Sequence, residues 1–270
     1  MKIITSIFDL NKEIKNYRNI GFVPTMGGIH EGHKSLIKAS QSKKKMTIVS
    51  IFVNPTQFNK KDDFKKYPRN IQNDIAILKK LNVEYLFTPN AKEIYRFKAK
   101  KFNLKKKDKI LCAKFRVGHF EGVLNVMNRL LTIIKSKDLY MGEKDYQQLY
   151  LIKKFLSKKF KVRVNSCPTV RINNKIALST RNKLLKKGSF KKASEISLFL
   201  KKIKFKSKLE GSKLAFNLHN YKKELEKKYK IKIDYLEFRD EKNLKLNNFK
   251  NKYRLFVAYK IDNVRLIDNY

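Results

Sequence analysis

The sequence predicts an α/β fold with a parallel sheet, followed by a smaller α+β domain. Helix and strand patterns alternate through the first 165 residues or so of the 270-residue chain. The apolar run Lys45–Val53 is nearly continuous and β-branched, which is typical of a strand buried on both faces of a parallel sheet. After Pro168 the pattern changes to charged helices and then strands. We therefore place the two domains at residues 1–168 and 169–270.

The stretch Phe22–His33 is the most informative part of the sequence. After an expected helix over residues 6–18, it joins an apolar strand to a Pro-Thr-Met-Gly-Gly turn and to the start of an amphipathic helix. Such a turn points backbone N–H groups and the positive end of a helix at a phosphate. His30 and His33 lie three residues apart on an exposed first helical turn, so both rings can meet one anion. Two solvated histidines beside a glycine turn are the alternative.

The next elements continue the alternation. The strand in Lys45–Val53 ends at the loop Asn54–Phe58, and ligands of open α/β sheets bind at such strand ends. Gln57 in this loop could hydrogen-bond a small polar substrate or could simply be solvated. Pro68 is expected in the first turn of a helix. The inner face of that helix is an apolar stripe of Ile71, Ile75, Leu78 and Leu81.

A strand over residues 83–87 comes next, and then a lysine-rich segment, 98–109, that we expect to be mobile and on the surface. His119 lies between two glycines before a helix whose inner face we predict from Val123, Met127, Leu130 and Ile134. A histidine in a loop is more often structural or solvated than catalytic, so alone it is a weak signal. The pattern thus predicts a helix here without assigning a role to His119.

The segment Gly142–Gln148 follows a short strand over residues 138–141 and begins another helix. A lysine after a glycine at a strand end is again typical of phosphate binding, with Lys144 as a point charge. Asp145 could bond a ribose hydroxyl or cap the helix. The inner face of this helix is predicted as Tyr146, Leu149, Ile152 and Leu156, and a strand over residues 160–167 completes the first domain.

The second domain begins with a polar loop, 177–182, that precedes two charged helices at about 189–204 and 213–230. Three strands are expected after them, at 231–238, 253–259 and 264–267. Asp262-Asn263 between the last two strands predicts a tight hairpin.

The formal charge of +42 would usually indicate a nucleic-acid partner. However, 54 of the 65 basic residues are lysines spread along the whole chain. Proteins that recognise a nucleotide sequence rely mainly on arginine for their contacts with the bases. We interpret the excess as compositional bias and expect no nucleic-acid partner. No apolar run reaches membrane-spanning length and no signal peptide is recognised. With Cys112 and Cys167 interpreted as reduced thiols, we expect a cytoplasmic protein without a membrane partner.

The motifs in both domains together resemble one enzyme family. His30-Glu31-Gly32-His33 is similar to the HxGH signature of the nucleotidylyltransferase superfamily. Further motifs, in order, are Val23–Gly27, Ser50–Phe58, Tyr67–Arg69, Gly142–Leu149, Ser179–Asn182 and Arg265–Asn269. This set resembles the pantoate–β-alanine ligases, or pantothenate synthetases, over nearly the whole chain.

The resemblance implies a homodimer with a Rossmann-like parallel-sheet N-terminal domain and a smaller α+β domain that closes over the site. It implies condensation of (R)-pantoate with β-alanine through a pantoyl adenylate, with ATP consumed to AMP and diphosphate. Mg²⁺ would be carried mainly by the phosphates, and its protein ligands stay unknown. His33 would be the proton donor, helped by His30, Lys144 and Arg181.

The resemblance also implies the binding residues. The residues expected to contact ATP are Met26, Gly27, Gly28, Ile29, His30, Glu31, Gly32, His33, Gly142, Glu143, Lys144, Asp145, Val170, Leu178, Ser179, Thr180 and Arg181. Gln57 and Gln148 would bind pantoate, and Gln57 would also contact β-alanine.

Some positions depart from the family pattern. Cys112 and Ala113 stand where the family usually has Glu-Gly, Val117 where it has Pro, Asn174-Lys175 where it has Asp-Gly, and Thr180 where it has Ser; the stretch after Tyr95 lacks a Pro-Asn-Gly. These changes concern loops around the site. Two other classes stay open: a relative that leaves the nucleotidyl group on its product, and an RNA-binding protein that uses the basic surface.

Overall fold

The computed structural model of the chain describes residues 1–59, 61–65, 67–247, 249 and 251–270. The chain divides into two compact units, Met1–Val170 and Arg171–Tyr270, two residues after the expected boundary. Each unit has its own sheet and its own apolar core.

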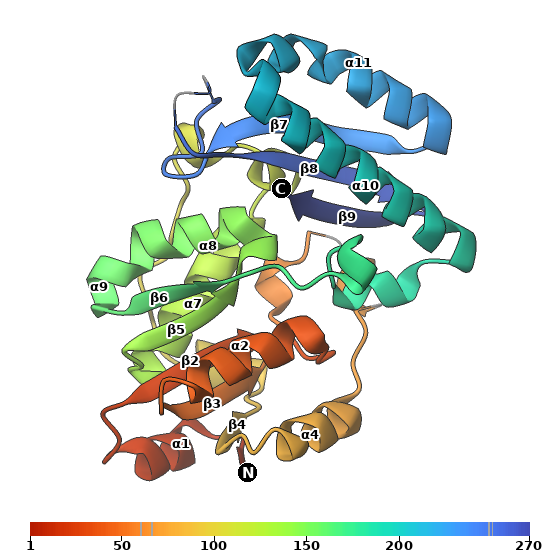
Figure 1. Cartoon of the computed structure of the whole chain (residues 1–270). Coiled ribbons are helices and arrows are strands. Elements are labelled where there is room, and N and C mark those ends of the chain that lie inside the picture. The colour runs from red at the N-terminus through yellow and green to blue at the C-terminus, as the bar shows by residue number, and fades with distance from the viewer. Residues whose placement is uncertain (60, 66, 248, 250) are drawn as a thin grey trace. The chain divides into compact units, whose positions relative to one another are not determined.

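The described part of the first unit contains a six-stranded parallel sheet (Figure 1). Its strands are β1 (Lys2–Ile4), β2 (Ile20–Thr25), β3 (Met46–Ile51), β4 (Tyr85–Phe87), β5 (Asp138–Gly142) and β6 (Arg163–Cys167). They lie in the order β1-β4-β3-β2-β5-β6, and every neighbouring pair is parallel. The chain moves outward from β2 to β3 and β4 and later crosses to β5 on the other side of β2. Open α/β sheets bind ligands at the carboxyl ends of strands where the order reverses in this way.

Helices connect these strands. They are α1 (Ile7–Ile14), α2 (Glu31–Gln41), α3 (Lys61–Lys65), α4 (Ile71–Lys80), α5 (Ala91–Tyr95), α6 (Cys112–Phe115), α7 (His119–Ile134), α8 (Tyr146–Ile152) and α9 (Lys158–Phe160). Shorter helical turns are η1 (Pro55–Gln57), η2 (Lys106–Asp108), η3 (Glu143–Asp145) and η4 (Lys153–Ser157). Because β-strands buried under helices on both faces need apolar side chains on both, the near-continuous apolar runs found in the sequence follow from this layering.

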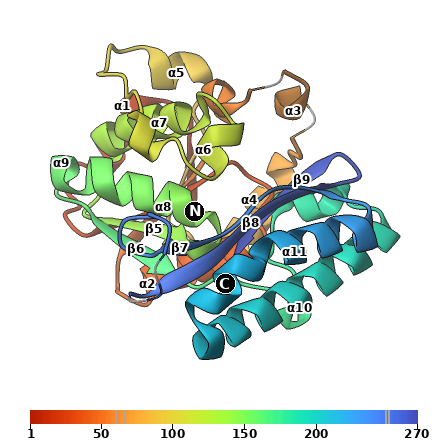
Figure 2. The ribbon, with the colours of Figure 1, turned by 90° about the horizontal axis from the view of Figure 1, so that it is seen from above.

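The helices cover both faces of the sheet. On one face, Leu36 and Ile37 of α2 and Leu78 of α4 form a core with Val23 of β2 and Val49 of β3. On the other face α7 packs against α1 (Figure 2). Along each strand, successive buried apolar side chains point to opposite faces of the sheet, because side chains in a β-strand alternate with a period of two residues.

Several predicted elements differ from the structure, among them the following three. The first helix begins where expected, with Ser6 as a cap that accepts from the backbone N–H of Asp9 at 3.1 Å, but it ends at Ile14 and is shorter than expected. Pro68 lies before its helix, because Asn70 is the cap of α4. The third difference concerns the lysine-rich segment.

That segment, 98–109, is anchored at several points instead of lying wholly on the surface. Leu104 and Asp108 are buried, and Lys154 of η4 forms an ion pair with Asp108. The backbone N–H of Phe102 donates to the side chain of Asn125 at 2.9 Å. The lysines between these anchored residues remain exposed. The lysine-rich composition therefore gave no indication that Leu104 and Asp108 are buried.

The second unit is an antiparallel sheet covered by two long helices. Its elements are η5 (Ile172–Asn174), η6 (Thr180–Leu184), α10 (Lys187–Glu210), α11 (Ser212–Tyr229), β7 (Lys232–Asp240), β8 (Tyr253–Ile261) and β9 (Val264–Asn269). The strands lie in the order β7-β8-β9, and α10 and α11 run side by side over them (Figures 1 and 2). Asp262 and Asn263 both have positive φ, 48° and 62°, which confirms the predicted hairpin turn.

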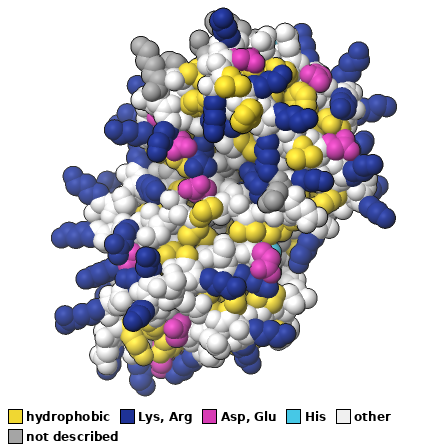
Figure 3. All heavy atoms as spheres, viewed as in Figure 1, with side chains coloured by type: hydrophobic (Ala, Val, Ile, Leu, Met, Phe, Trp, Pro, Cys, Tyr) yellow, Lys and Arg dark blue, Asp and Glu magenta, His cyan; other side chains and the backbone are white. Residues whose placement is uncertain are grey.

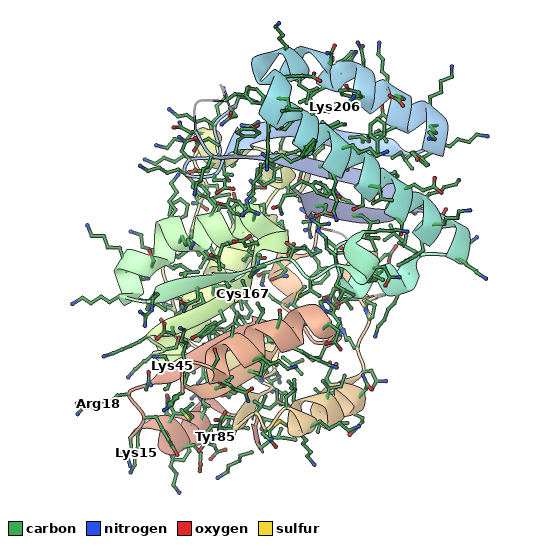
Figure 4. The ribbon with its side chains drawn as sticks, viewed as in Figure 1. Lys15, Arg18, Lys45, Tyr85, Cys167 and Lys206 are labelled. Carbon is green, nitrogen blue, oxygen red and sulfur yellow. The ribbon has the colours of Figure 1, made fainter. Side chains whose placement is uncertain are left out.

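The predicted fold class is confirmed: a Rossmann-like parallel-sheet unit is followed by a smaller α+β unit. Both cysteines are buried, and Cys167 lies at the end of β6 (Figure 4). Among the described residues, no helix is both long and apolar enough to cross a membrane.

Candidate functional site

The turn after β2 is a left-handed glycine turn held by a carboxylate. Gly27 and Gly28 have φ of 80° and 64°, a region that glycine adopts at little cost. The buried carboxylate of Asp74, on α4, accepts hydrogen bonds from the backbone N–H groups of Gly28 and Ile29, both at 2.8 Å. The prediction that this turn points its N–H groups at a phosphate is therefore wrong for these two amides, because the protein's own carboxylate takes them.

The two histidines that follow lie face to face. The rings of His30 and His33 are stacked with centroids 4.1 Å apart, which confirms that spacing of three residues brings them together. Nδ1 of His30 accepts from the N–H of Gly32 at 3.1 Å, and Nδ1 of His33 accepts from the N–H of His30 at 3.4 Å. In a neutral imidazole with Nδ1 as acceptor, Nε2 carries the hydrogen. Both rings therefore present an Nε2–H donor.

His33 is partly buried, so the expectation of an exposed or solvated side chain is wrong. Burial is the main cause that lowers the pKa of His33 to about 3, and the positive charge of Lys144 acts in the same direction. The negative charge of Asp145 opposes this shift. The ring is consequently neutral at physiological pH in the free protein.

Lys144 and Asp145 follow the carboxyl end of β5. This strand lies beside β2, on the side opposite to β3. The charges of both side chains act on His33, so the structure brings the β2 and β5 motifs into one site. Nζ of Lys144 lies 3.4 Å from Oδ1 of Asp145. Asp145 does not cap α8 with its side chain, which removes one of its two predicted roles and leaves its carboxylate half-exposed.

The other residues of the two predicted phosphate segments differ in their burial and partners. Met26 is partly buried, and its sulfur accepts from Nε2 of Gln57 at 2.8 Å. Glu31 points to the surface, where it forms an ion pair with Lys34 at 2.7 Å. Gly142 and Glu143 end β5 and begin η3, both partly buried.

Gln57 is buried instead of solvated, with an exposed fraction of 8%. It ends η1, the short turn after β3, and its Oε1 accepts from the amide of Asn54 at 3.2 Å. Asn54 is fixed in turn, since its Oδ1 accepts from the hydroxyl of Tyr95 at 2.6 Å. Together with the contact to Met26, these bonds place the predicted pantoate ligand beside the predicted phosphate turn.

The second predicted pantoate ligand, Gln148, lies in the first turn of α8 and is partly buried. Its neighbour Gln147 is buried, and the Nε2 of Gln147 donates to the carbonyl of Ile110 at 2.7 Å. Gln147 therefore ties α8 to the segment before α6, while Gln148 stays accessible.

The remaining predicted residues lie at the end of the first unit or in the second. Val170 ends the first unit. Ser179 caps η6 by accepting from the N–H of Arg181 at 3.3 Å. Leu178 is partly buried, Thr180 is buried, and Arg181 is partly exposed. Residues 178–181 thus form a tight local turn within the second unit.

Sequence reasoning missed two residues that shape the site and set one aside. Asp74 was hidden inside an amphipathic helix pattern, where a polar residue on the inner face was the available signal. Asn54 was noted only as part of a motif. His119 was judged weak, yet it is buried and contacts the backbone of Gln57.

Among the described residues, no group of three or more His, Cys, Asp or Glu side chains could hold a metal ion. The carboxylate of Asp145 lies 3.4 Å from Nζ of Lys144. Mg²⁺ that is bound through nucleotide phosphates needs only one or two carboxylates from the protein, so this carboxylate fits a magnesium ion that arrives with a nucleotide.

The chain is similar in sequence to proteins of one enzyme family. The sequence profile of the pantoate-beta-alanine ligase family matches residues 2–270. The pantothenate synthetase of Flavobacterium psychrophilum is 37% identical over 279 residues, which cover 97% of this chain and 98% of the relative. That of Francisella tularensis subsp. novicida is 40% identical over 271 residues, covering 99% and 95%.

Solved structures are similar over the full chain. The pantothenate synthetase from Thermus thermophilus has a TM-score of 0.92 at 30% identity and covers 100% of this chain and 99% of its own. The pantoate-beta-alanine ligase from Francisella tularensis, complexed with beta-gamma ATP and beta-alanine, has a TM-score of 0.86 at 39% identity, covering 100% and 97%. The resemblance inferred from motifs is thus confirmed, and the chain belongs to the pantoate–beta-alanine ligase family.

Proposed function

We propose that this chain condenses pantoate with β-alanine at the expense of ATP, yielding pantothenate, AMP and diphosphate. The observation that carries the proposal is the stacked His30–His33 pair at the end of β2, electrostatically coupled to Lys144 at the end of β5. This places two Nε2–H donors and an ammonium group at the switch point of the sheet, where a triphosphate can lie. Membership of the ligase family supports the choice of substrates.

In the first step, a carboxylate oxygen of pantoate attacks the α-phosphorus of ATP. The bond from that phosphorus to the bridging oxygen of the β-phosphate breaks, and diphosphate leaves with the electron pair. Such a displacement needs positioning and charge stabilisation more than covalent help from the protein. Lys144 supplies positive charge as negative charge grows on the phosphate oxygens.

His33 has two states in this scheme. In the free protein the ring is neutral, and its Nε2–H donates a hydrogen bond. When phosphates lie against the ring, their negative charge raises the pKa and favours the imidazolium form. That form can give a proton to the leaving diphosphate, so the binding of ATP prepares the proton donor.

In the second step, the amine of β-alanine attacks the acyl carbon of the adenylate, the bond from that carbon to the phosphate oxygen breaks, and AMP leaves. The amides of Gln57 and Gln148 are proposed to hold the hydroxyls and carboxylate of pantoate, and Gln57 to contact β-alanine as well. An amide can both donate and accept, which suits a substrate that offers both kinds of group.

The remaining roles follow from the family resemblance. Mg²⁺ would neutralise phosphate charge, with Asp145 or Glu143 as its protein contact. Residues 178–181 and Val170 would contact ATP, and Arg181 would neutralise developing charge. We also propose a cytoplasmic homodimer, which sedimentation of the purified protein would test against a monomer.

Chromatography of the products from ATP, pantoate and β-alanine tests the proposed function. We expect pantothenate, AMP and diphosphate in equal amounts, and no pantothenate when either acid is omitted. Release of diphosphate without AMP would instead indicate an enzyme that leaves the nucleotidyl group on its product. Tight RNA binding at physiological salt with no ATP turnover would indicate the RNA-binding alternative.

A further inference from the structure

His119 has a place in the structure that its sequence context did not reveal. It is the first residue of α7, directly after Gly118, whose φ is 82°. Its side chain is only 7% exposed. The two ring nitrogens face two different partners: Nδ1 lies 2.7 Å from the carbonyl oxygen of Gln57, and Nε2 lies 2.8 Å from Nη1 of Arg116.

These two contacts fix the position of the ring hydrogen. A guanidinium group can only donate, so Nε2 of His119 must accept from Arg116. In the neutral ring the hydrogen then sits on Nδ1, which donates it to the carbonyl oxygen of Gln57. This tautomer is opposite to the one that the backbone contacts impose on His30 and His33.

Gln57 is held from other directions as well. Its Oε1 accepts from Asn54, whose amide also donates to the carbonyl of Gly122 in α7 at 3.2 Å. A Cβ added at Gly122 would lie 2.5 Å from the carbonyl oxygen of Thr56 and 2.9 Å from Cα of Gln57. The first turns of α7 therefore pack directly on the backbone of η1. His119 adds a hydrogen bond to the carbonyl oxygen of Gln57, the last residue of η1.

We propose that His119, held by Arg116 with its hydrogen on Nδ1, is a positioning residue that sets the orientation of Gln57 for pantoate. This inference rests on the proposed function, in which Gln57 contacts pantoate. His119 acts through the backbone of Gln57, so its loss should affect pantoate and leave ATP unaffected. A displacement of one ångström in a positioning group can change a rate about 100-fold.

Three substitutions separate the hydrogen bond from simple packing. In His119→Asn the amide nitrogen lies the same number of bonds from Cα as Nδ1, so it can still donate to the carbonyl of Gln57. In His119→Gln the amide oxygen takes the place of Nε2 and accepts from Arg116, so the direct match to Nδ1 is lost. His119→Ala removes both groups.

Steady-state kinetics with pantoate and ATP varied in turn measures the effect. We expect His119→Gln and His119→Ala to raise the KM for pantoate about 10- to 100-fold, and His119→Asn to stay within about threefold of the unsubstituted protein. The KM for ATP should be unchanged in all three. Equal kinetics in all variants, or parallel losses for ATP and pantoate, would overturn the inference.

A second measurement does not depend on activity. The chain has only four histidines, so the ¹⁵N chemical shifts of its imidazoles can be assigned by substitution. We expect the hydrogen on Nδ1 in His119 and on Nε2 in His30 and His33. A hydrogen on Nε2 of His119 overturns the inference. An unsubstituted protein that makes no pantothenate overturns the proposed function, whereas an active protein with unaffected His119 variants overturns this inference alone.

Discussion

At the residue scale, the hydrogen-bond partners of a side chain decide which chemistry it can perform. Backbone N–H groups occupy Nδ1 of both His30 and His33, so the outward nitrogen of each ring is the donor. Burial keeps His33 neutral in the free protein. The same ring in solution would be half-charged near pH 6.5 and free to exchange tautomers.

Replacement of His33 tests its proposed role. We expect His33→Ala to reduce diphosphate release by about 100-fold or more, while the far-UV circular dichroism stays unchanged. His33→Gln should retain more activity, because its amide nitrogen takes the place of Nε2. Diphosphate release by His33→Ala at the rate of the unsubstituted protein would contradict the assignment.

The lowered pKa of His33 also predicts a dependence of stability on pH. Between pH 6.5 and about 3 the unfolded chain binds a proton at this residue and the folded protein does not, so the free energy of unfolding falls as the pH falls. From pH 7 to pH 5 the contribution of His33 should fall by about 2 kcal/mol. Urea unfolding at both pH values should show this loss in the unsubstituted protein and a smaller loss in His33→Gln. Equal losses in both proteins would disprove the shift.

The two glutamines give a prediction about pantoate. Removal of one amide in Gln57→Ala or Gln148→Ala leaves a substrate hydroxyl unpaired, which costs about 1–3 kcal/mol. The apparent affinity for pantoate should fall by about one to two decades, with ATP binding little changed. Gln72→Ala, at an exposed position on α4, is the control. Weaker ATP binding with unaltered pantoate affinity would place the acid pocket elsewhere.

At the element scale, a helix distant in sequence holds the glycine turn after β2 in its conformation. The glycine turn between β2 and α2 adopts positive φ at two residues, and Asp74 of α4 stabilises it through two backbone hydrogen bonds. A Cβ at Gly27 would lie 2.9 Å from the Asp74 carboxylate. The turn therefore needs both glycine and a buried acceptor, and α2 begins with its histidines in place as a result.

Asp74→Asn tests this clamp. Asparagine offers one acceptor oxygen, so one of the two buried N–H groups faces an amide donor instead. We expect the free energy of unfolding to fall by about 1–3 kcal/mol and the KM for ATP to rise, as measured by urea unfolding and steady-state kinetics. Asp62→Asn, at an exposed position on α3, should change neither. Unchanged stability in Asp74→Asn would show that the turn holds its shape without the carboxylate.

At the scale of the whole molecule, the basic residues are spread along the entire chain. Figure 3 shows lysine and arginine side chains over the whole visible face, with a few acidic side chains among them. Lys15 and Arg18, just after α1, are exposed and project away from the ribbon (Figure 4). Exposed, separated cations repel one another and bind polyanions weakly and without sequence preference.

We therefore predict that RNA is irrelevant to the reaction. RNA affinity, measured by filter binding, should fall steeply as salt is raised from about 50 to about 200 mM. Pantothenate formation by a nuclease-treated preparation should equal that of the untreated protein. Loss of activity after nuclease treatment, with recovery on addition of RNA, would contradict the prediction.

Much of the fold could be predicted because local patterns agree with it. The apolar run of β3 and the stripe of α7 each match the period of the element that they form. Asp262-Asn263 suits a turn that needs two positive φ values. The boundaries were less accurate: α1 ends at Ile14 instead of residue 18, and the cap of α4 is Asn70, after Pro68.

The motifs identified by sequence alone also located the two halves of the first unit's site. The histidines after β2 and the lysine after β5 are local features, each readable from a strand end, a glycine and a helix start. Parallel strands on either side of a switch point have their carboxyl ends at the same edge of the sheet, so the histidines after β2 and the lysine after β5 are expected to lie near each other. Sequence thus determined the family, the fold class and the chemical groups.

Only the tertiary structure decided how those groups are held. Asp74 is 46 residues from the glycine turn that it clamps, and His119 is 62 residues from the carbonyl that it contacts. No periodicity links such residues, because the bonds arise where one helix end packs on the loop after another strand. Tautomers and the pKa of His33 depend on the same long-range contacts and on burial. They are properties of packing, and a local pattern carries no information about them.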